Sequence, residues 1–314
     1  PCSPLFALPL TENLLLKGMK KFGILIYFLV VSIGATEYYP SSIKEYRAMG
    51  ETVYKKDKSK NKYNVYKLEK KILEGPYLLT VNYLYYQTKI SVKRELIVLT
   101  PTISGVSSLE KTVARYFSKR GYDVIIPIAF ETQIEFNEQT VKYMDRGFFR
   151  PVAQAKLMIE ELRSKNNYEK TFLLGASQGG IRSTMLLGEN LNIDKAFTFV
   201  AGGDFPKLYA ETTVKQLIEF RQKHMAALGI TKTSDYEDYL RENLTFDPKQ
   251  ACVKSNVEMK MLIATEDTSV PTETQYDLWK ACGEPELIKV KGGHVKGVLK
   301  MYWMRKEILN FFKN

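Results

Sequence analysis

Residues 171–180 read TFLLGASQGG, an apolar run that passes through a Gly-x-Ser-x-Gly motif into a stretch of helical character. Glycines two positions before and after Ser177 allow a tight strand-to-helix turn that exposes the serine hydroxyl. Without a strand before it and a helix after it, the same motif would be an ordinary glycine-rich turn. We therefore predict that Ser177 is a nucleophile at the carboxyl end of a strand in an α/β fold.

Apolar residues on both sides of this motif predict the rest of the sheet. Short unbroken apolar runs lie at residues 96–99, 124–126, 172–174, 197–200 and 261–264. Helical spacing is shown by Leu109, Val113, Tyr116 and Phe117, by Val152, Ala155, Ile159 and Leu162, and by Val295, Leu299, Tyr302 and Leu309. Unbroken apolar strands are typical of a parallel sheet with helices on both faces. The alternation of strands and helices predicts a mostly parallel, doubly wound sheet.

The first third of the chain has a different pattern. Apolar and polar residues alternate at 63–65 and again at 77–85, with Gly75 and Pro76 between the two segments. This alternation predicts strands with one wet face, and so an antiparallel edge on the N-terminal side of the sheet. The run KKDKSKNK at 55–62 is the densest charge cluster, and we interpret it as a solvated loop or turn.

Residues 204–250 interrupt the alternation of strands and helices. This segment is mostly polar, has helical character and contains no buried strand run, although a strand is predicted on each side of it. Ligands bind α/β sheets in the crevice at the carboxyl ends of the strands, and an insertion at this position would cover that crevice. We therefore predict a helical cap.

Length and composition fit one globular catalytic domain, which we place at residues 36–314. The chain has 314 residues, of which 45% are hydrophobic and 26% charged, and it can bury a sizeable core. The formal net charge is +11, but the lysines are scattered and no nucleic-acid-binding motif accompanies them. We expect no nucleic-acid partner.

The N-terminus, residues 1–35, has the form of a leader followed by a secretory signal peptide. Met19 begins a basic stretch, an apolar run follows at 22–33, and small residues suited to a signal peptidase follow directly. We predict a signal peptide at about 19–35 and export to the periplasm or the medium, with residues 1–18 upstream of the natural start. The apolar run is shorter than the ~20 residues of a membrane-spanning helix, so we expect no permanent span.

The cysteines leave two interpretations open. Cys2 lies in the leader, and Cys252 and Cys282 then form an even pair in a chain that we expect to reach an oxidising compartment. A disulfide and two buried free thiols are both compatible with the sequence, which carries no Cα separation. No spacing of cysteine and histidine indicates a metal site, and we expect no metal and no organic cofactor.

A serine hydroxyl needs a base within hydrogen-bond reach to act as a nucleophile. The chain has only two histidines, His224 and His294. His294 lies in KGGHVKG, after the strand-like residues 286–290 and before the last helical stretch, where a loop faces the serine. His224 lies in a polar helix of the predicted cap, and we expect it on the surface. We predict that His294 is the general base.

The base in turn needs a carboxylate that orients it and stabilises its charged form. Asp267 follows the strand-like run MLIA within ATEDTSVP, one strand before His294. Asp204, after the preceding strand, is the alternative acid, and we expect the neighbouring Glu266 to point elsewhere. The predicted triad is therefore Ser177, Asp267 and His294, in that order along the chain.

From about residue 95 to its end, the chain resembles an α/β hydrolase of the esterase and dienelactone-hydrolase type. The motifs that carry the resemblance are GASQG, VLTPTISGVSS at 98–108, RGYDVIIP at 120–127, TEDTSVP and GGHVKG. The resemblance implies an oxyanion hole made by the backbone N–H of Gln178 and by that of Thr102 or Ile103. A His-Gly pair is common before the oxyanion residue and is replaced here by Thr100 and Pro101, so both candidates stay open.

The triad and the resemblance together predict a serine hydrolase that cleaves carboxylic esters of small molecules through an acyl-enzyme. A peptidase or amidase of the same fold is the alternative, because the same triad cleaves amides. A non-catalytic binding relative is less favoured, because such relatives typically lack a triad member and all three candidates are present.

Overall fold

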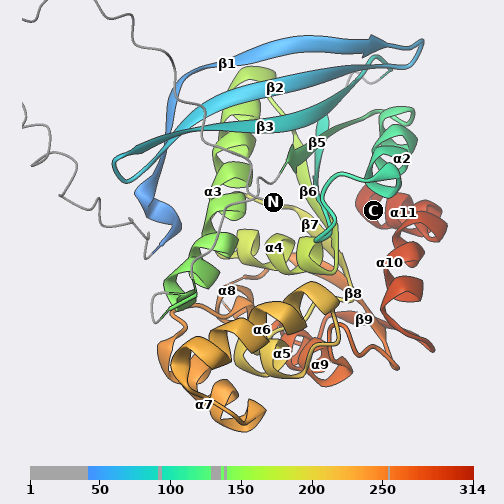
Figure 1. The fold of residues 1–314 in the computed structure, drawn as a ribbon. Helices are drawn as coiled ribbons and strands as arrows, with labels where there is room; N and C mark the ends of the chain where they lie inside the picture. The colour runs from blue at the N-terminus through green and yellow to red at the C-terminus, as the bar shows by residue number, and fades with distance from the viewer. Residues whose placement is uncertain (1–41, 91–93, 129–135, 138–139, 254) are drawn as a thin grey trace, which may run out of the picture. The chain divides into compact units, whose positions relative to one another are not determined.

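The computed structural model of the protein describes residues 42–90, 94–128, 136–137, 140–253 and 255–314. These residues form a nine-stranded sheet in the order β1-β2-β3-β5-β4-β6-β7-β8-β9 (Figure 1). The leader and the signal peptide predicted from the sequence lie outside the described residues. In the part of the chain that is described, no helix combines the length and the apolar character that crossing a membrane requires.

The N-terminal edge of the sheet is antiparallel. Its elements are η1 (Ile43–Glu45), β1 (Tyr46–Ser59), β2 (Tyr63–Glu74) and β3 (Tyr77–Thr88). β1 pairs with β2, and β2 with β3, in antiparallel register, and Gly75 takes a positive φ of 53° in the turn between β2 and β3. β3 then pairs antiparallel with β5, which joins this edge to the parallel strands. The predicted antiparallel edge is confirmed.

The lysine-rich run at 55–62 is not the loop that its charge predicted. Residues 55–59 belong to β1, and only residues 60–62 form the turn to β2. β1 is an edge strand that pairs with β2 alone, so its lysines remain exposed, and Lys55 forms a 2.8 Å ion pair with Glu69 of β2. Charged side chains are common on edge strands because they prevent pairing with further strands.

The remaining strands are parallel to one another. They are β4 (Glu95–Thr100), β5 (Tyr122–Ile128), β6 (Lys170–Ala176), β7 (Lys195–Phe199), β8 (Glu258–Ala264) and β9 (Glu286–Val290). β4, β6 and β7 lie in the middle of the sheet and are buried almost throughout, as their unbroken apolar sequences predicted. The mostly parallel, doubly wound sheet is confirmed.

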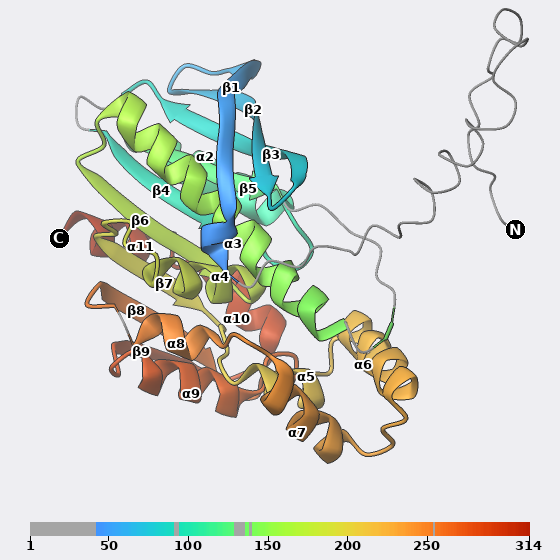
Figure 2. The same ribbon diagram turned by 90° about the vertical axis from the view of Figure 1, so that its left-hand side faces the viewer.

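Helices cover both faces of the sheet and bury a hydrophobic core on each (Figures 1 and 2). On one face lie α2 (Ser108–Ser118), α10 (His294–Trp303) and α11 (Arg305–Lys313). On the other lie α3 (Thr140–Asn166), α4 (Gln178–Leu187) and α9 (Thr272–Ala281). α4 follows β6 directly and places the serine motif at the carboxyl end of a central strand.

The C-terminal helical stripe is different from the predicted one. The chain forms two helices, α10 and α11, and Val295 is 71% exposed in the first of them. The face of α10 that packs on the sheet carries Gly297 instead, where a Cβ atom would overlap the side chain of Val200. A glycine lets the helix backbone approach the sheet closely, and a hydropathy pattern does not register a buried glycine.

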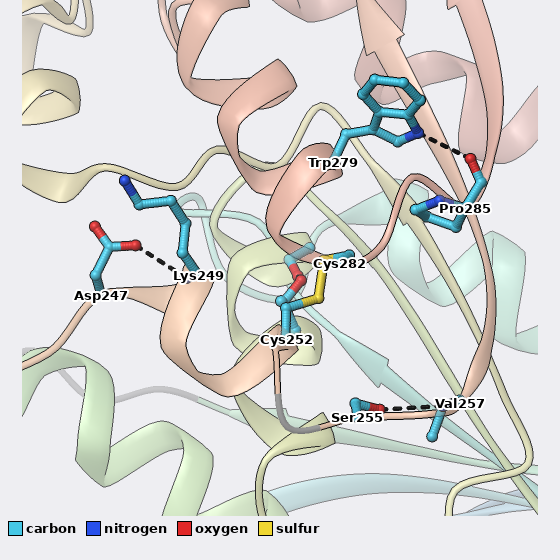
Figure 3. The surroundings of a disulfide bond; sticks show 10 residues. Asp247, Lys249, Cys252, Ser255, Val257, Trp279, Cys282 and Pro285 are labelled. Atoms are coloured by element: carbon cyan, nitrogen blue, oxygen red, sulfur yellow. Dashed lines mark hydrogen bonds between the residues drawn. A yellow bond between two sulfur atoms is a disulfide. The ribbon is translucent and has the colours of Figure 1, made fainter.

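Four helices intervene between β7 and β8, where the sequence predicted a cap. They are α5 (Phe205–Glu211), α6 (Lys215–Leu228), α7 (Thr233–Asn243) and α8 (Pro248–Cys252), and together we call them the helical insertion. A disulfide joins Cys252, the last residue of α8, to Cys282 after α9, with the Cα atoms 4.8 Å apart (Figure 3). The insertion is thereby tied covalently to the helix that follows β8.

Candidate active site

Ser177 lies in a sharp turn between β6 and α4. Its φ and ψ are 56° and −130°, a strained conformation for a residue with a side chain, and its N–H donates to the carbonyl oxygen of Phe199 at 2.8 Å. Added Cβ atoms on Gly175 and Gly179 would overlap atoms of Thr100. Both glycines of the motif are therefore required by the close approach of β4, and the turn projects the serine from the end of the strand.

A continuous chain of hydrogen bonds joins Ser177, His294 and Asp267. His294 is the first residue of α10, and its Nε2 lies 2.9 Å from the Oγ of Ser177. Its Nδ1 lies 2.7 Å from the Oδ2 of Asp267, whose side chain is buried. These three residues follow the carboxyl ends of β6, β8 and β9. Because the strands are parallel, these ends lie on the same side of the sheet.

The carboxylate of Asp267 is held by four hydrogen bonds. Its Oδ1 accepts from the backbone N–H groups of Ser269 and Val270, at 2.9 and 3.0 Å. Its Oδ2 accepts from the Nε2 of Gln275 at 2.9 Å, in addition to the bond with His294. Donors on both oxygens hold the carboxylate in one orientation. Gln275, a fully buried residue of α9, was not identified from the sequence.

Two backbone segments beside Ser177 can donate to a developing oxyanion. Gln178 begins α4, so its N–H has no acceptor within the helix. The N–H of Thr102 donates instead to the buried carboxylate of Glu110 at 3.3 Å, and the Thr102 hydroxyl donates to the same oxygen at 3.2 Å. The N–H of Ile103 has no hydrogen-bond partner among the described residues. Of the two candidate donors, the N–H of Thr102 is therefore already bonded, and that of Ile103 has no acceptor within the described residues.

Comparison with known proteins gives matches by structure alone. No family model and no curated protein sequence matches the chain. An acetyl xylan esterase from a Paenibacillus species matches with a TM-score of 0.69 and 11% identity, over 84% of this chain and 88% of that one. Acetyl xylan esterase 1 from a Thermoanaerobacterium species matches with a TM-score of 0.65 and 13% identity, over 83% and 91%. The chain has the α/β-hydrolase fold.

A longer protein shares the same α/β-hydrolase fold. The acylaminoacyl peptidase of Pyrococcus horikoshii matches with a TM-score of 0.54 and 12% identity. The match covers 85% of this chain but only 55% of the peptidase. At identities of this order, the three likenesses establish the fold and leave the reaction to be argued from the site.

Asp204, the alternative acid, lies elsewhere in this α/β-hydrolase fold. It caps the N-terminus of α5, and its carboxylate accepts hydrogen bonds from Arg241 at 3.0 Å and from Lys249 at 3.2 Å. The hydrogen-bond partner of His294 is thus Asp267 and not Asp204. Glu266 is exposed, as expected from its position beside Asp267.

His224 is not on the surface, and this expectation was wrong. The residue is fully buried, and its Nδ1 lies 3.0 Å from the hydroxyl of Tyr236 in α7. The rings of Phe220 and Tyr239 contact it edge-on. Burial lowers the pKa of His224 to about 4, so the imidazole is neutral at pH 7. A polar helix sequence did not reveal that aromatic residues of α7 would enclose it.

A cavity of about 480 Å³ adjoins the site at Gln178. Its wall is formed by the loop 102–106, by α3, and by residues of the helical insertion that include Tyr209 and Phe220. Arg182 of α4 also lines it, and the sequence analysis did not identify this residue. Within the described ranges, no three His, Cys, Asp or Glu side chains are grouped as a metal ion would require.

Proposed function

We propose that the protein is a serine hydrolase that cleaves carboxylic esters of small molecules. The observation that carries this proposal is the hydrogen-bonded chain from Ser177 through His294 to Asp267, with the serine in a strained turn. The arrangement provides a nucleophile, a base within 2.9 Å of it, and a buried carboxylate behind the base, which is the combination that acyl transfer requires. Esterases among the structural neighbours support the same reaction.

In the proposed acylation step, Ser177 Oγ attacks the ester carbonyl while His294 Nε2 takes the hydroxyl proton. The Asp267 carboxylate holds Nδ1–H and stabilises the imidazolium that forms. Collapse of the tetrahedral intermediate breaks the bond to the alcohol, and His294 returns the proton to the alkoxide oxygen. The products of this step are a free alcohol and an acyl group on Ser177.

The proposed deacylation step repeats this chemistry with water. His294 Nε2 removes a proton from a water molecule, which attacks the acyl carbonyl and forms a second tetrahedral intermediate. The Ser177 oxygen then leaves with the proton from His294, and the carboxylic acid is released. No redox or metal chemistry takes part in either step.

The oxyanion of both intermediates would be bound by the backbone N–H groups of Gln178 and Ile103. Donors that are already oriented before the reaction stabilise the developing charge without reorganisation, and each contributes about 3 to 4 kcal/mol when measured by deletion. Glu110 supports this arrangement by holding the preceding residue, Thr102, in place through its N–H and hydroxyl.

The helical insertion would act as the cap over the substrate cavity. Tyr209, Leu217 and Phe220 of α5 and α6 line the cavity together with Gln178, so the insertion and the site share one wall. The catalytic domain would then extend over residues 36–314, with the cap at about 204–250. The side chains that the cap contributes to the cavity wall would then select which acyl and alcohol groups are accepted.

We also propose that the chain is exported after cleavage near residue 35. The disulfide between Cys252 and Cys282 supports this, because structural disulfides form and persist mainly in oxidising compartments. N-terminal sequencing of the protein from the periplasm or medium of an expressing bacterium tests the proposal. A mature N-terminus close to residue 36 supports export, and a protein retained with its full N-terminus contradicts it.

Hydrolysis of a p-nitrophenyl ester series, from acetate to long-chain acyl groups, tests the main proposal. We expect activity with an optimum chain length set by the cavity, and covalent labelling of Ser177 by a fluorophosphonate probe. The Ser177→Ala variant should not be labelled. Labelling that persists in this variant would remove Ser177 from the mechanism, and a folded protein that is inactive on every ester would favour an amidase or a binding role.

Amide hydrolysis is the second candidate, because an acylaminoacyl peptidase shares the fold and the same chemistry cleaves amides. Matched substrates discriminate between the two. We compare kcat/KM for an acyl p-nitrophenyl ester with kcat/KM for the acyl p-nitroanilide of the same chain length. We expect the ratio of these two values to exceed the ratio of the uncatalysed hydrolysis rates of the two substrates. An equal or smaller ratio would assign the protein to the peptidases.

A further inference from the structure

Arg182 is a buried cation without a counter-charge among the described residues. Its side chain lies on α4, is 6% exposed, and lines the cavity beside Gln178. It forms no ion pair and no hydrogen bond with any residue in the described ranges, and its Nε has no partner. Burial lowers its pKa to about 10, so the guanidinium still carries its charge at neutral pH.

Other arginines with buried side chains are bonded. Arg146 and Arg150, which also line the cavity, both donate to the buried carboxylate of Glu74, with Arg150 Nε at 2.7 Å. The half-buried Arg163 also has an acceptor, because it donates to the backbone carbonyl of Asn192 at 2.8 Å. Among the buried arginines of the described ranges, Arg146 and Arg150 therefore have a carboxylate acceptor and Arg182 has none.

An unpaired charge in this position is costly to the free protein. A buried guanidinium loses its hydration, and with no carboxylate among the described residues to replace the water it destabilises the fold. Such a cost is retained where a ligand supplies the missing partner. Arg182 faces a cavity large enough to admit one, and its planar group binds carboxylates and phosphates through two parallel hydrogen bonds.

The helix places Arg182 on the same side as the reaction centre. Gln178 and Arg182 are four residues apart on α4, so they lie on one face of the helix, about 6 Å apart along its axis. Gln178 is the residue next to Ser177 and the proposed oxyanion donor. A ligand whose ester carbonyl reached Gln178 would extend a few atoms further into the cavity to reach Arg182.

We propose that Arg182 makes the protein selective for anionic esters, whose second functional group is an oxyanion such as a carboxylate or phosphate. This rests on the proposed ester hydrolysis and adds the substrate class to it. The oxyanion occupies the cavity and bonds to the guanidinium, while the ester carbonyl lies at Ser177. Neutral esters of the same length fill the cavity but leave Arg182 unpaired.

Two matched substrate pairs test this selectivity. In the first pair, mono-4-nitrophenyl glutarate has a carboxylate on the acyl side and 4-nitrophenyl pentanoate has none. In the second pair, O-acetyl-lactate has a carboxylate on the alcohol side and isopropyl acetate has none. We expect kcat/KM to favour the anionic member of at least one pair, and this preference to fall about 10- to 100-fold in Arg182→Met. Arg182→Lys keeps the charge without the planar fork and should retain part of the preference.

Arg47→Met is the matched control. Arg47 is exposed on β1 at the far edge of the sheet, and its loss removes the same formal charge. We expect the substrate preference of this variant to equal that of the wild type. A preference that falls equally in both variants would mean that overall charge, and not Arg182, selects the substrate, and would overturn the proposal.

A binding measurement separates this inference from the proposed function. Glutarate and inorganic phosphate are titrated separately, and the thermal unfolding midpoint is followed. At least one should raise the midpoint of the wild type but not of Arg182→Met, and the stronger of the two identifies carboxylate or phosphate as the preferred group. If the shift is lost in Arg182→Met but the wild type hydrolyses no ester, the anion site is retained and the proposed esterase function is rejected. Hydrolysis with no preference in either pair and no shift would reject the anion site alone.

Discussion

The carboxyl ends of the parallel strands and the helical insertion each contain one histidine and one candidate aspartate. The two pairs lie in opposite surroundings. At the carboxyl ends of the strands, His294 bonds on one side to the buried Asp267 and on the other to Ser177. In the insertion, His224 is enclosed by aromatic rings, and Asp204 is neutralised by a lysine and an arginine. The same residue types form the proposed catalytic site in one region and take part in packing in the other.

The difference lies in the partners that each fold region supplies. A histidine acts as a base when one nitrogen is fixed by a carboxylate and the other reaches a proton donor. His294 meets both conditions because three parallel strands end at one edge. His224 has a tyrosine hydroxyl and rings around it, and burial holds it neutral. Four experiments, taken from the largest expected effect to the smallest, test this contrast.

Removing the nucleophile should have the largest effect. Ser177→Ala is expected to lower kcat for a p-nitrophenyl ester by about 10⁵- to 10⁶-fold, because no other group can form the acyl-enzyme. Ser118→Ala, a buried serine of α2 that bonds only to a helix carbonyl, serves as the control and should retain wild-type kcat. Comparable losses in the two variants would show that the site chemistry has been misassigned.

Exchanging the two aspartates for asparagine compares the regions directly. Asp267→Asn should lower kcat by about 10⁴-fold, because an amide neither fixes the tautomer of His294 nor stabilises its charge. Asp204→Asn keeps a good N-cap for α5 and should leave kcat unchanged. The measurement is kcat at pH 8 for both variants. A larger loss in Asp204→Asn would reverse the assignment of the acid.

Breaking the disulfide should lower the stability of the protein without removing any group of the proposed catalytic site. Cys282→Ser is expected to lower the free energy of unfolding by about 3 to 4 kcal/mol, because the bond closes a segment of 30 residues in the unfolded chain. Urea denaturation followed by circular dichroism measures the change. Dithiothreitol should destabilise the wild type to the same extent and have no effect on the variant. Unequal effects would show that the serine itself disturbs packing.

Acid should destabilise the insertion through His224. The pKa of this residue is lowered to about 4, against 6.5 in the unfolded chain, so the unfolded state binds the proton more tightly. Its contribution is fully present above pH 6.5 and is lost as the pH falls towards 4, by about 3 kcal/mol. His224→Gln should show a smaller loss of stability between pH 7.5 and 4.5 than the wild type. Identical pH dependence in both proteins would contradict the buried neutral state.

Local sequence patterns predicted the features that depend on neighbouring residues. The unbroken apolar runs became the parallel strands, and the alternating runs became the antiparallel edge. The glycines around Ser177 placed it in the strained turn, because only glycine tolerates the approach of β4 at those positions. The failures at 55–59 and at Val295 have one cause: which face of a strand or helix is covered depends on elements far away in the sequence.

The sequence by itself determined the fold class, the turn at Ser177 and a short list of candidate bases and acids, because these depend on residue type and local spacing. Only the tertiary structure bonded Asp267 and not Asp204 to His294, brought Gln275 to the carboxylate, buried His224 and left Arg182 without a partner among the described residues. Each of these outcomes is a contact or a missing contact between elements that are distant in sequence. Hydrogen bonding and desolvation act over a few ångströms in space, and the chain order does not encode that proximity locally.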